Sequence, residues 1–232
     1  MITKINNAWP HRFPRPSGIL TTLSLLLLVG CTSVQAPHLS TSLGLSAIEN
    51  MGELYQRNAS IAVYVEPKAR DLMLRGEYKY TKYEFGAGQA FTVKLLKALS
   101  YQFNRVVILK NLQSKPESPV DAVMTVALQD ADMSFEIKPG FAIITTSSFA
   151  RLAMRAELRD GQGTVVWVGT ARSEGQGEGQ ARGRLTEEEA ARQIALGIES
   201  AIDTTVADLI KQMTQSPNMR RYLQEWEQRR RT

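Results

Sequence analysis

The residues that could do chemistry in this chain are few. Its 232 residues include one cysteine, Cys31, and two histidines, His11 and His38, all of them near the N-terminus. Hydrolases of the Ser-His-Asp or Cys-His type need an imidazole beside the nucleophile, and a zinc site needs several imidazole or thiolate ligands. The sequence therefore predicts a protein that is not an enzyme and has no metal site and no cofactor.

Carboxylates offer the remaining catalytic alternative. Asp130, Asp132 and Glu136 lie along a predicted strand, and Asp130 and Asp132 share one of its sides. Two facing carboxylates can cleave a glycosidic bond. Acids on a strand are more commonly solvated surface residues, so an enzyme acting on glycan is the less favoured interpretation.

Two glycine-rich stretches resemble phosphate-binding loops only superficially. Gly86-Ala87-Gly88 precedes a predicted helix, but Phe91 stands where a dinucleotide-binding motif has its third glycine. We therefore expect a tight connection between strand and helix there. The second stretch, Gly175 to Gly183, is predicted to be a mobile loop, with the alternative that a partner orders it.

The C-terminal segment is basic and amphipathic. Arg220, Arg221, Tyr222 and Trp226 form a candidate partner surface that could meet phosphates of lipopolysaccharide or the acids of peptidoglycan. The alternative is that the aromatic side chains cover the protein's own domain and the arginines are simply solvated.

An apolar run leads up to the single cysteine. Residues 19–29 are hydrophobic, which is about half the ~20 residues needed to span a bilayer, and basic residues precede them. The sequence Leu28-Val29-Gly30-Cys31 resembles the lipobox of bacterial lipoproteins. The resemblance implies that the leader 1–30 is removed and that Cys31 is covalently lipidated.

The residue after the cysteine bears on location. In the lipoprotein family an aspartate at that position favours retention at the inner membrane, and here it is Thr32. The resemblance therefore implies a lipid anchor on the periplasmic face of the outer membrane. An uncleaved anchor, or an ordinary signal peptide with a chance cysteine, is the alternative.

The remaining chain divides into three predicted parts. Residues 31–50 are the lipidated cysteine and a Ser/Thr-rich flexible tether, residues 51–215 form a single domain, and residues 216–232 form the C-terminal helix. The net charge of +5 includes three basic residues of the leader, so the part after the leader is nearly neutral. This composition argues against a nucleic-acid partner.

Hydrophobic periodicity predicts the elements of the domain. Extended segments are expected at 60–65, 77–85, 106–109 and 121–137. A helix should begin after Gly88 and continue to Phe103, with Lys94 and Lys97 on its exposed side. Residues 150–158 and 164–170 are predicted to form a hairpin around the turn Asp160-Gly161-Gln162-Gly163.

The C-terminal third is predicted to be helical. Thr186-Glu187-Glu188-Glu189 is a capping box, and apolar residues follow it at helical spacing up to Met213. Ser216-Pro217 predicts the start of another helix. The order of elements predicts an α/β (α+β) fold in which a mixed sheet with a long hairpin is packed by two main helices and followed by a C-terminal helix.

The hairpin carries a second resemblance. Residues 151–167 resemble a strand-turn-strand unit of the curli-secretion lipoprotein group, which includes lipoprotein activators of penicillin-binding proteins. The acidic turn that this group has after its first strand is replaced here by Glu66-Pro67-Lys68. The resemblance implies a fold more than an activity.

Three functions follow as hypotheses. The first is a non-catalytic, outer-membrane-anchored periplasmic lipoprotein that binds or assembles with an envelope complex for secretion, polysaccharide export or cell-wall synthesis, with a homo-oligomer among the expected assemblies. The second is a carrier of an apolar ligand or lipid, which requires an apolar pocket between sheet and helices. The third is the glycan-acting enzyme.

Overall fold

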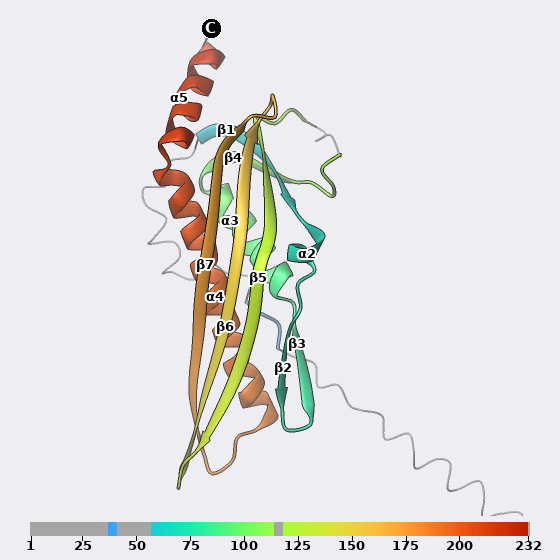
Figure 1. The fold of residues 1–232 in the computed structure, drawn as a ribbon, viewed down its shortest axis with the longest axis vertical. Coiled ribbons are helices and arrows are strands. Elements are labelled where there is room, and N and C mark those ends of the chain that lie inside the picture. Colours follow the sequence, from blue (N-terminus) through green and yellow to red (C-terminus); the bar gives the residue numbers. More distant parts are fainter. Residues whose placement is uncertain (1–36, 41–56, 114–117, 232) are drawn as a thin grey trace, which may run out of the picture. The chain divides into compact units, whose positions relative to one another are not determined.

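A five-stranded mixed sheet forms the centre of the fold (Figure 1). The computed structural model describes residues 37–40, 57–113 and 118–231. The strands of the sheet, in the spatial order β4-β1-β5-β6-β7, are β4 (Phe103–Ile108), β1 (Arg57–Val65), β5 (Ala122–Pro139), β6 (Ile143–Asp160) and β7 (Val165–Arg182). β1 runs parallel to both β4 and β5, whereas β5, β6 and β7 are antiparallel. The predicted α+β class with a mixed sheet and a long hairpin is confirmed.

Two helices, α3 (Ala87–Ser100) and α4 (Glu187–Gln215), lie behind the sheet in Figure 1. The predicted capping box begins α4: the Thr186 hydroxyl accepts from the Glu189 amide, and the Glu189 carboxylate accepts from the Thr186 amide. The predicted apolar stripe of α4 is buried throughout, at Ile194, Ile198, Ile202, Val206, Leu209, Ile210 and Met213. The hydrophobic stripe therefore holds this long helix on the sheet.

The long helix α4 is followed by the shorter α5 (Pro217–Arg231). The turn between them begins at Ser216, whose hydroxyl accepts from the Met219 amide at 3.3 Å, as the cap-then-proline pattern predicts. No helix in the described part of the chain is long and apolar enough to cross a membrane.

A bulge in β5 decides which side chains face the helices. Before it, Met124 and Val126 point into the core; beyond it, Met133 and Phe135 do so. The pairing with β6 shifts by one residue between Leu128 and Asp130, which exchanges the two faces of the strand. The acidic residues after the bulge, Asp130, Asp132 and Glu136, therefore all face away from the core.

The predicted extended segment 77–85 is a hairpin. β2 (Leu74–Tyr78) pairs antiparallel with β3 (Thr81–Phe85), and Lys79 in the tight turn adopts φ 55°. Tyr78 packs edge-on against Phe135 of β5, with ring centroids 6.3 Å apart. The hairpin thus lies beside the far half of β5, beyond the end of β1 (Figure 1). A short helix, α2 (Pro67–Arg70), connects β1 to it.

The first main helix is shorter than predicted. It ends at Ser100, and Phe103, where the predicted helix ends, already belongs to β4. The predicted exposure of Lys94 is also wrong. Its side chain is 1% exposed and its ammonium donates to the Asp203 carboxylate of α4 at 2.7 Å, because α4 covers the side of α3 that the sequence leaves polar.

The prediction of a mobile loop at Gly175–Gly183 is wrong. Residues up to Arg182 belong to β7, which pairs with β6 along almost its whole length. Gly175 and Gly177 face α4. A β-carbon on Gly175 would lie 2.1 Å from the Gly197 carbonyl oxygen, and one on Gly177 would lie 2.5 Å from the Gln193 carbonyl oxygen. These glycines therefore allow the helix backbone to rest directly on the strand.

Candidate functional site

The most specific site of the sequence lies outside the described residues. Leu28, Val29, Gly30 and Cys31 all precede the described part of the chain. Of the predicted tether, residues 37–40 are described: Leu39 packs against the core and the Ser40 amide donates to the Glu199 carboxylate at 2.6 Å. His38 is exposed there. Lipidation of Cys31 therefore stays a prediction.

The candidate partner surface on α5 separates into two parts. Tyr222 and Trp226 are more than nine-tenths buried, together with Met219 and Leu223, so the aromatic stripe covers the protein's own domain. The Tyr222 hydroxyl donates to the Asp121 carbonyl at 2.8 Å. Arg220 and Arg221 are exposed, and Arg220 also donates to the Gln215 carbonyl at 3.0 Å. The surface open to a partner is that of the arginines.

A cleft of about 400 Å³ separates α5 from the turn that joins β6 and β7. Tyr222 and Trp226 line it from α5, and Asp121, just before β5, and Asp160, at the end of β6, line the other side. Burial, and after it the nearby carboxylates Asp121 and Asp160, raise the pKa of Tyr222 to about 12. The phenol stays protonated at physiological pH, as an ordinary tyrosine does, and its hydroxyl acts as a hydrogen-bond donor to Asp121.

The acidic residues of β5 lie on the side of the sheet that faces away from the helices. The bulge turns Asp130, Asp132 and Glu136 outward together, as the shared side predicted for the two aspartates requires. The register then places Asp132 opposite Arg151 of β6, and Arg151 opposite Glu174 of β7. A row of alternating charge thus crosses three strands.

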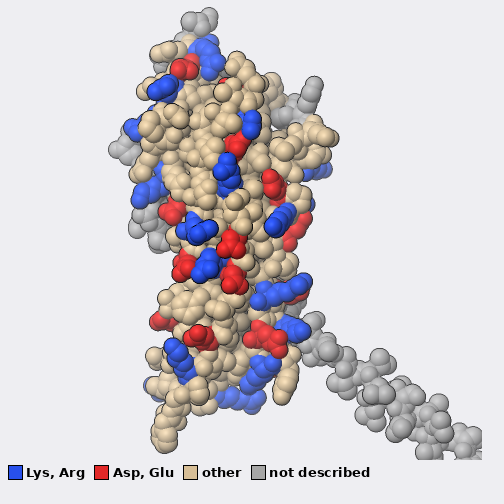
Figure 2. All heavy atoms as spheres, viewed as in Figure 1, with Lys and Arg blue, Asp and Glu red and all other residues tan. Residues whose placement is uncertain are grey.

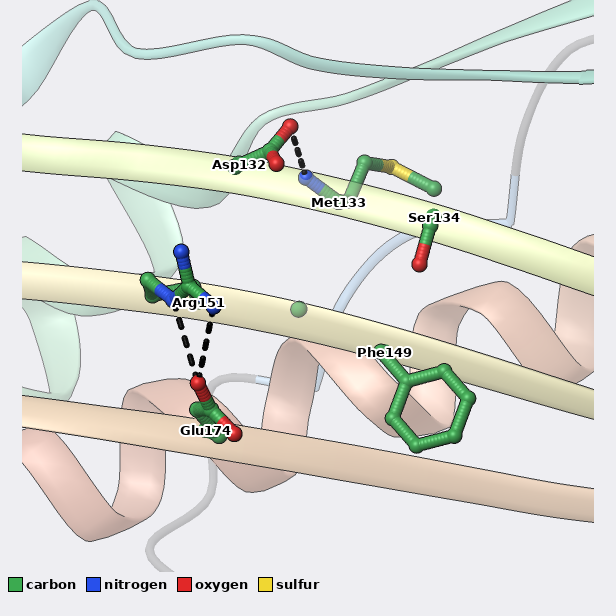
Figure 3. A pocket seen from close by; sticks show the side chains of 7 residues that line it. Asp132, Met133, Ser134, Phe149, Arg151 and Glu174 are labelled. Atoms are coloured by element: carbon green, nitrogen blue, oxygen red, sulfur yellow. Dashed lines mark hydrogen bonds and ion pairs between the residues drawn. The ribbon is translucent and has the colours of Figure 1, made fainter.

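This row forms part of a shallow hollow of about 240 Å³ on the sheet. Figure 3 shows Asp132, Arg151 and Glu174 side by side across the strands, with Ser134 and Phe149 next to them. Arg151 donates to one Glu174 oxygen through Nε and Nη2, at 3.1 and 3.0 Å. Phe149 is 40% exposed beside this pair. Aromatic residues are enriched in protein–protein interfaces relative to the rest of a protein surface.

We call the solvent-facing side of β5, β6 and β7 the outward face. Its central members are Asp130, Asp132, Ser134, Glu136, Phe149, Arg151, Arg155, Arg172, Glu174, Gln176 and Glu178. Figure 2 shows basic and acidic side chains intermixed over it rather than gathered by sign. Such a distribution offers no extended positive field for a polyanion.

The opposite side of these strands leaves little room for a ligand. Ser148 and Ser173 donate directly to helix carbonyls of α4, to Gln193 at 2.6 Å and to Ala201 at 2.7 Å. A carrier would therefore have to use another place. An apolar hollow of about 490 Å³ exists on the outer side of α3, lined by residues that include Leu72, Met73 and Val93.

The Gly86-x-Gly88 motif serves packing. The Gly88 amide donates to the Leu72 carbonyl at 3.0 Å, and a β-carbon on Gly88 would lie 2.2 Å from the Ala69 carbonyl oxygen. The glycine thus lets α3 approach α2, as the predicted tight connection requires. Among the described residues, no three His, Cys, Asp or Glu side chains come together as metal ligands.

Sequence reasoning missed the part that β7 plays in the outward face. The signal is present in the chain, because Arg172, Glu174, Gln176, Glu178 and Gln180 alternate with small residues over the whole stretch. A period of two is the mark of a strand. The glycines between the polar residues concealed it.

Comparisons with known proteins identify no family. No family model and no curated protein matches the chain. A solved structure described as a homolog of a neuraminyllactose-binding hemagglutinin, from Helicobacter pylori, aligns at 10% identity with a TM-score of 0.45, covering 83% of this chain and all of that one. A minor lipoprotein from Acinetobacter baumannii aligns at 14% identity with a TM-score of 0.32, over 72% of this chain and 96% of that one. We derive nothing about function from likenesses this distant.

Proposed function

We propose that the chain is a lipoprotein, anchored through Cys31 to the periplasmic face of the outer membrane, that binds an envelope protein complex and has no catalytic activity. The complex would serve secretion, polysaccharide export or cell-wall synthesis. The observation that carries the binding role is the outward face, on which Phe149 stands exposed beside the row Asp132-Arg151-Glu174. The lipobox resemblance supports the anchor.

The geometry of the outward face favours binding over catalysis. Asp130 and Asp132, the two carboxylates considered for glycan cleavage, are exposed on the same open side of β5. The Glu174 side chain is 69% exposed and bonded to Arg151. A general acid in a glycosidase needs a desolvated environment that keeps its proton at neutral pH, and an open sheet surface does not provide one.

Cys31→Ser should release the protein from the membrane. Serine has no thiol to be acylated, and the chain then has no other cysteine for the lipid. We expect the protein to move from the membrane pellet to the soluble fraction of lysed cells and to lack the mass of the acyl chains. Fractionation followed by intact-mass measurement checks both features. A full-length Cys31→Ser protein that stays in the pellet under alkaline carbonate wash would contradict the anchor.

Partner binding can be tested at Phe149. A photoreactive phenylalanine analogue at this position in the full chain should give a light-dependent adduct with one envelope protein of defined mass. Arg151→Glu should reduce the yield at least about tenfold, because it reverses the charge in the centre of the row.

The matched control places the same analogue at Leu196, an α4 residue that is 45% exposed. Equal adducts from Leu196 and Phe149 would show that the outward face is not the binding surface. A glycan-cleaving activity of the purified wild-type protein that Asp132→Asn abolishes would replace the binding role by an enzymatic one.

A further inference from the structure

The strand β7 ends the sheet, and its outer edge is the basis of a further inference that does not depend on the proposed function. Within the described residues β7 pairs with β6 alone, although both strands are 18 residues long. A long edge strand presents a row of unpaired peptide groups that can bind another strand. Natural proteins usually shorten or cover such edges.

The register shows which residues turn their peptide groups to this edge. The Gly183 amide donates to the Ala142 carbonyl of the β6 side at 3.4 Å, and bonded positions alternate along an antiparallel pair. The backbone N–H and C=O groups of odd-numbered β7 residues therefore point toward β6, and those of even-numbered residues point toward the outer edge. The Gln212 side chain agrees with this assignment, since it donates to the Thr170 carbonyl at 3.0 Å and closes the edge there. Among the described strands, none pairs with the outer edge of the stretch Arg172–Arg182.

The side chains of the open stretch are complementary to themselves. In a two-fold antiparallel pairing centred on Gly175, Arg172 lies opposite Glu178 of the partner subunit. The two-fold axis repeats this pair, so Glu178 likewise lies opposite Arg172 of the partner subunit. Glu174 lies opposite Gln176 of the partner subunit. No like charges lie opposite each other over residues 172–178. The residues whose peptide groups face the edge lie opposite each other in this register, so the two strands can form backbone hydrogen bonds.

Two features of the single chain fit this arrangement. Arg172 has no ion-pair partner among the residues that the structure describes. Within the part of the chain that the structure describes, the Glu178 carboxylate accepts one hydrogen bond, from the Gln176 side-chain amide at 2.6 Å, and its second oxygen can accept from an arginine. The glycines on the inner side also hold β7 against α4, so the edge is presented as a fixed strand rather than a mobile segment.

We propose that two copies of this chain associate through their β7 strands, in antiparallel pairing centred on Gly175, to form a six-stranded antiparallel layer from both β5–β7 units. A two-fold axis makes such an interface closed, so pairing stops at the dimer. The reciprocal ion pairs between Arg172 and Glu178 of the partner subunit fix its register.

A charge exchange tests the proposal. The full-length protein in density-matched detergent should sediment as a dimer over the micromolar range. Arg172→Glu and Glu178→Arg should each weaken the dimer at least about tenfold, because each change opposes like charges twice. The double variant Arg172→Glu/Glu178→Arg restores opposite charges and should regain the wild-type dissociation constant.

The control is Arg192→Glu on α4, which breaks an exposed pair with Glu188 away from β7 and should leave the dimer unchanged. Circular dichroism of each variant distinguishes loss of the dimer from loss of folding. Recovery of the dimer in the double variant would also show that the single variants are folded. A wild-type protein that is monomeric over the same range, or single variants as dimeric as the wild type, would overturn the proposal. So would a double variant that is folded but monomeric.

Discussion

Gly175→Ala should lower the free energy of unfolding by about 3 kcal/mol, the upper end of the range for overpacked sites. The added β-carbon would lie 2.1 Å from the Gly197 carbonyl oxygen and 2.2 Å from the Ala201 amide nitrogen. Both atoms belong to the backbone of α4, so no side chain can turn aside and the helix itself must move. The movement would loosen the apolar stripe from Ile194 onward.

Chemical denaturation of the full chain, followed by circular dichroism, measures this effect. Gly161→Ala in the turn between β6 and β7 is the matched control, because its β-carbon would meet nothing nearer than the Asp121 carbonyl oxygen at 3.9 Å. We expect its denaturation midpoint to stay at the wild-type value. A Gly175→Ala midpoint equal to that of the control would show that the strand and helix backbones are not in contact.

The glycine stretch also shows where sequence reasoning reached its limit. Glycine-rich polar segments are usually flexible because they cannot pack side chains, and that rule predicted a loop. Here the packing partner is the backbone of α4, which comes 22 residues later in the chain at Gly197, itself a glycine. The close approach requires small residues both in β7 and in the part of α4 that packs on it. Local composition does not reveal it, although the alternation from Arg172 to Gln180 does indicate a strand.

Elements whose cause is local were predicted well. The capping box at Thr186, the apolar stripe of α4 and the turn at Asp160 each depend on residues within a few positions, and the structure confirms all three. The outward face depends on strand register, which the bulge between Leu128 and Asp130 sets. The sequence could therefore place the two aspartates on one side, but it could not bring Arg151 between Asp132 and Glu174.

Asp203→Ala should lower the free energy of unfolding by about 3 kcal/mol, because it leaves the Lys94 ammonium buried without a counter-charge. The Lys94 side chain is 1% exposed, whereas that of Asp203 is 22% exposed. Water can thus reach the position of the removed carboxylate in part, which is why we expect the lower end of the range for broken buried pairs. The same denaturation experiment measures the loss.

Two further variants separate the cost of an unpaired charge from the value of the pair. Lys94→Met/Asp203→Leu removes both charges while keeping apolar volume between α3 and α4, and we expect its stability to lie within about 1 kcal/mol of the wild type. Arg192→Ala breaks the exposed pair with Glu188, which should cost no more than about 0.5 kcal/mol. If Asp203→Ala were no more harmful than Arg192→Ala, Lys94 would have to reach water without its partner. If the double variant were as unstable as Asp203→Ala, the loss would come from packing between the two helices rather than from charge.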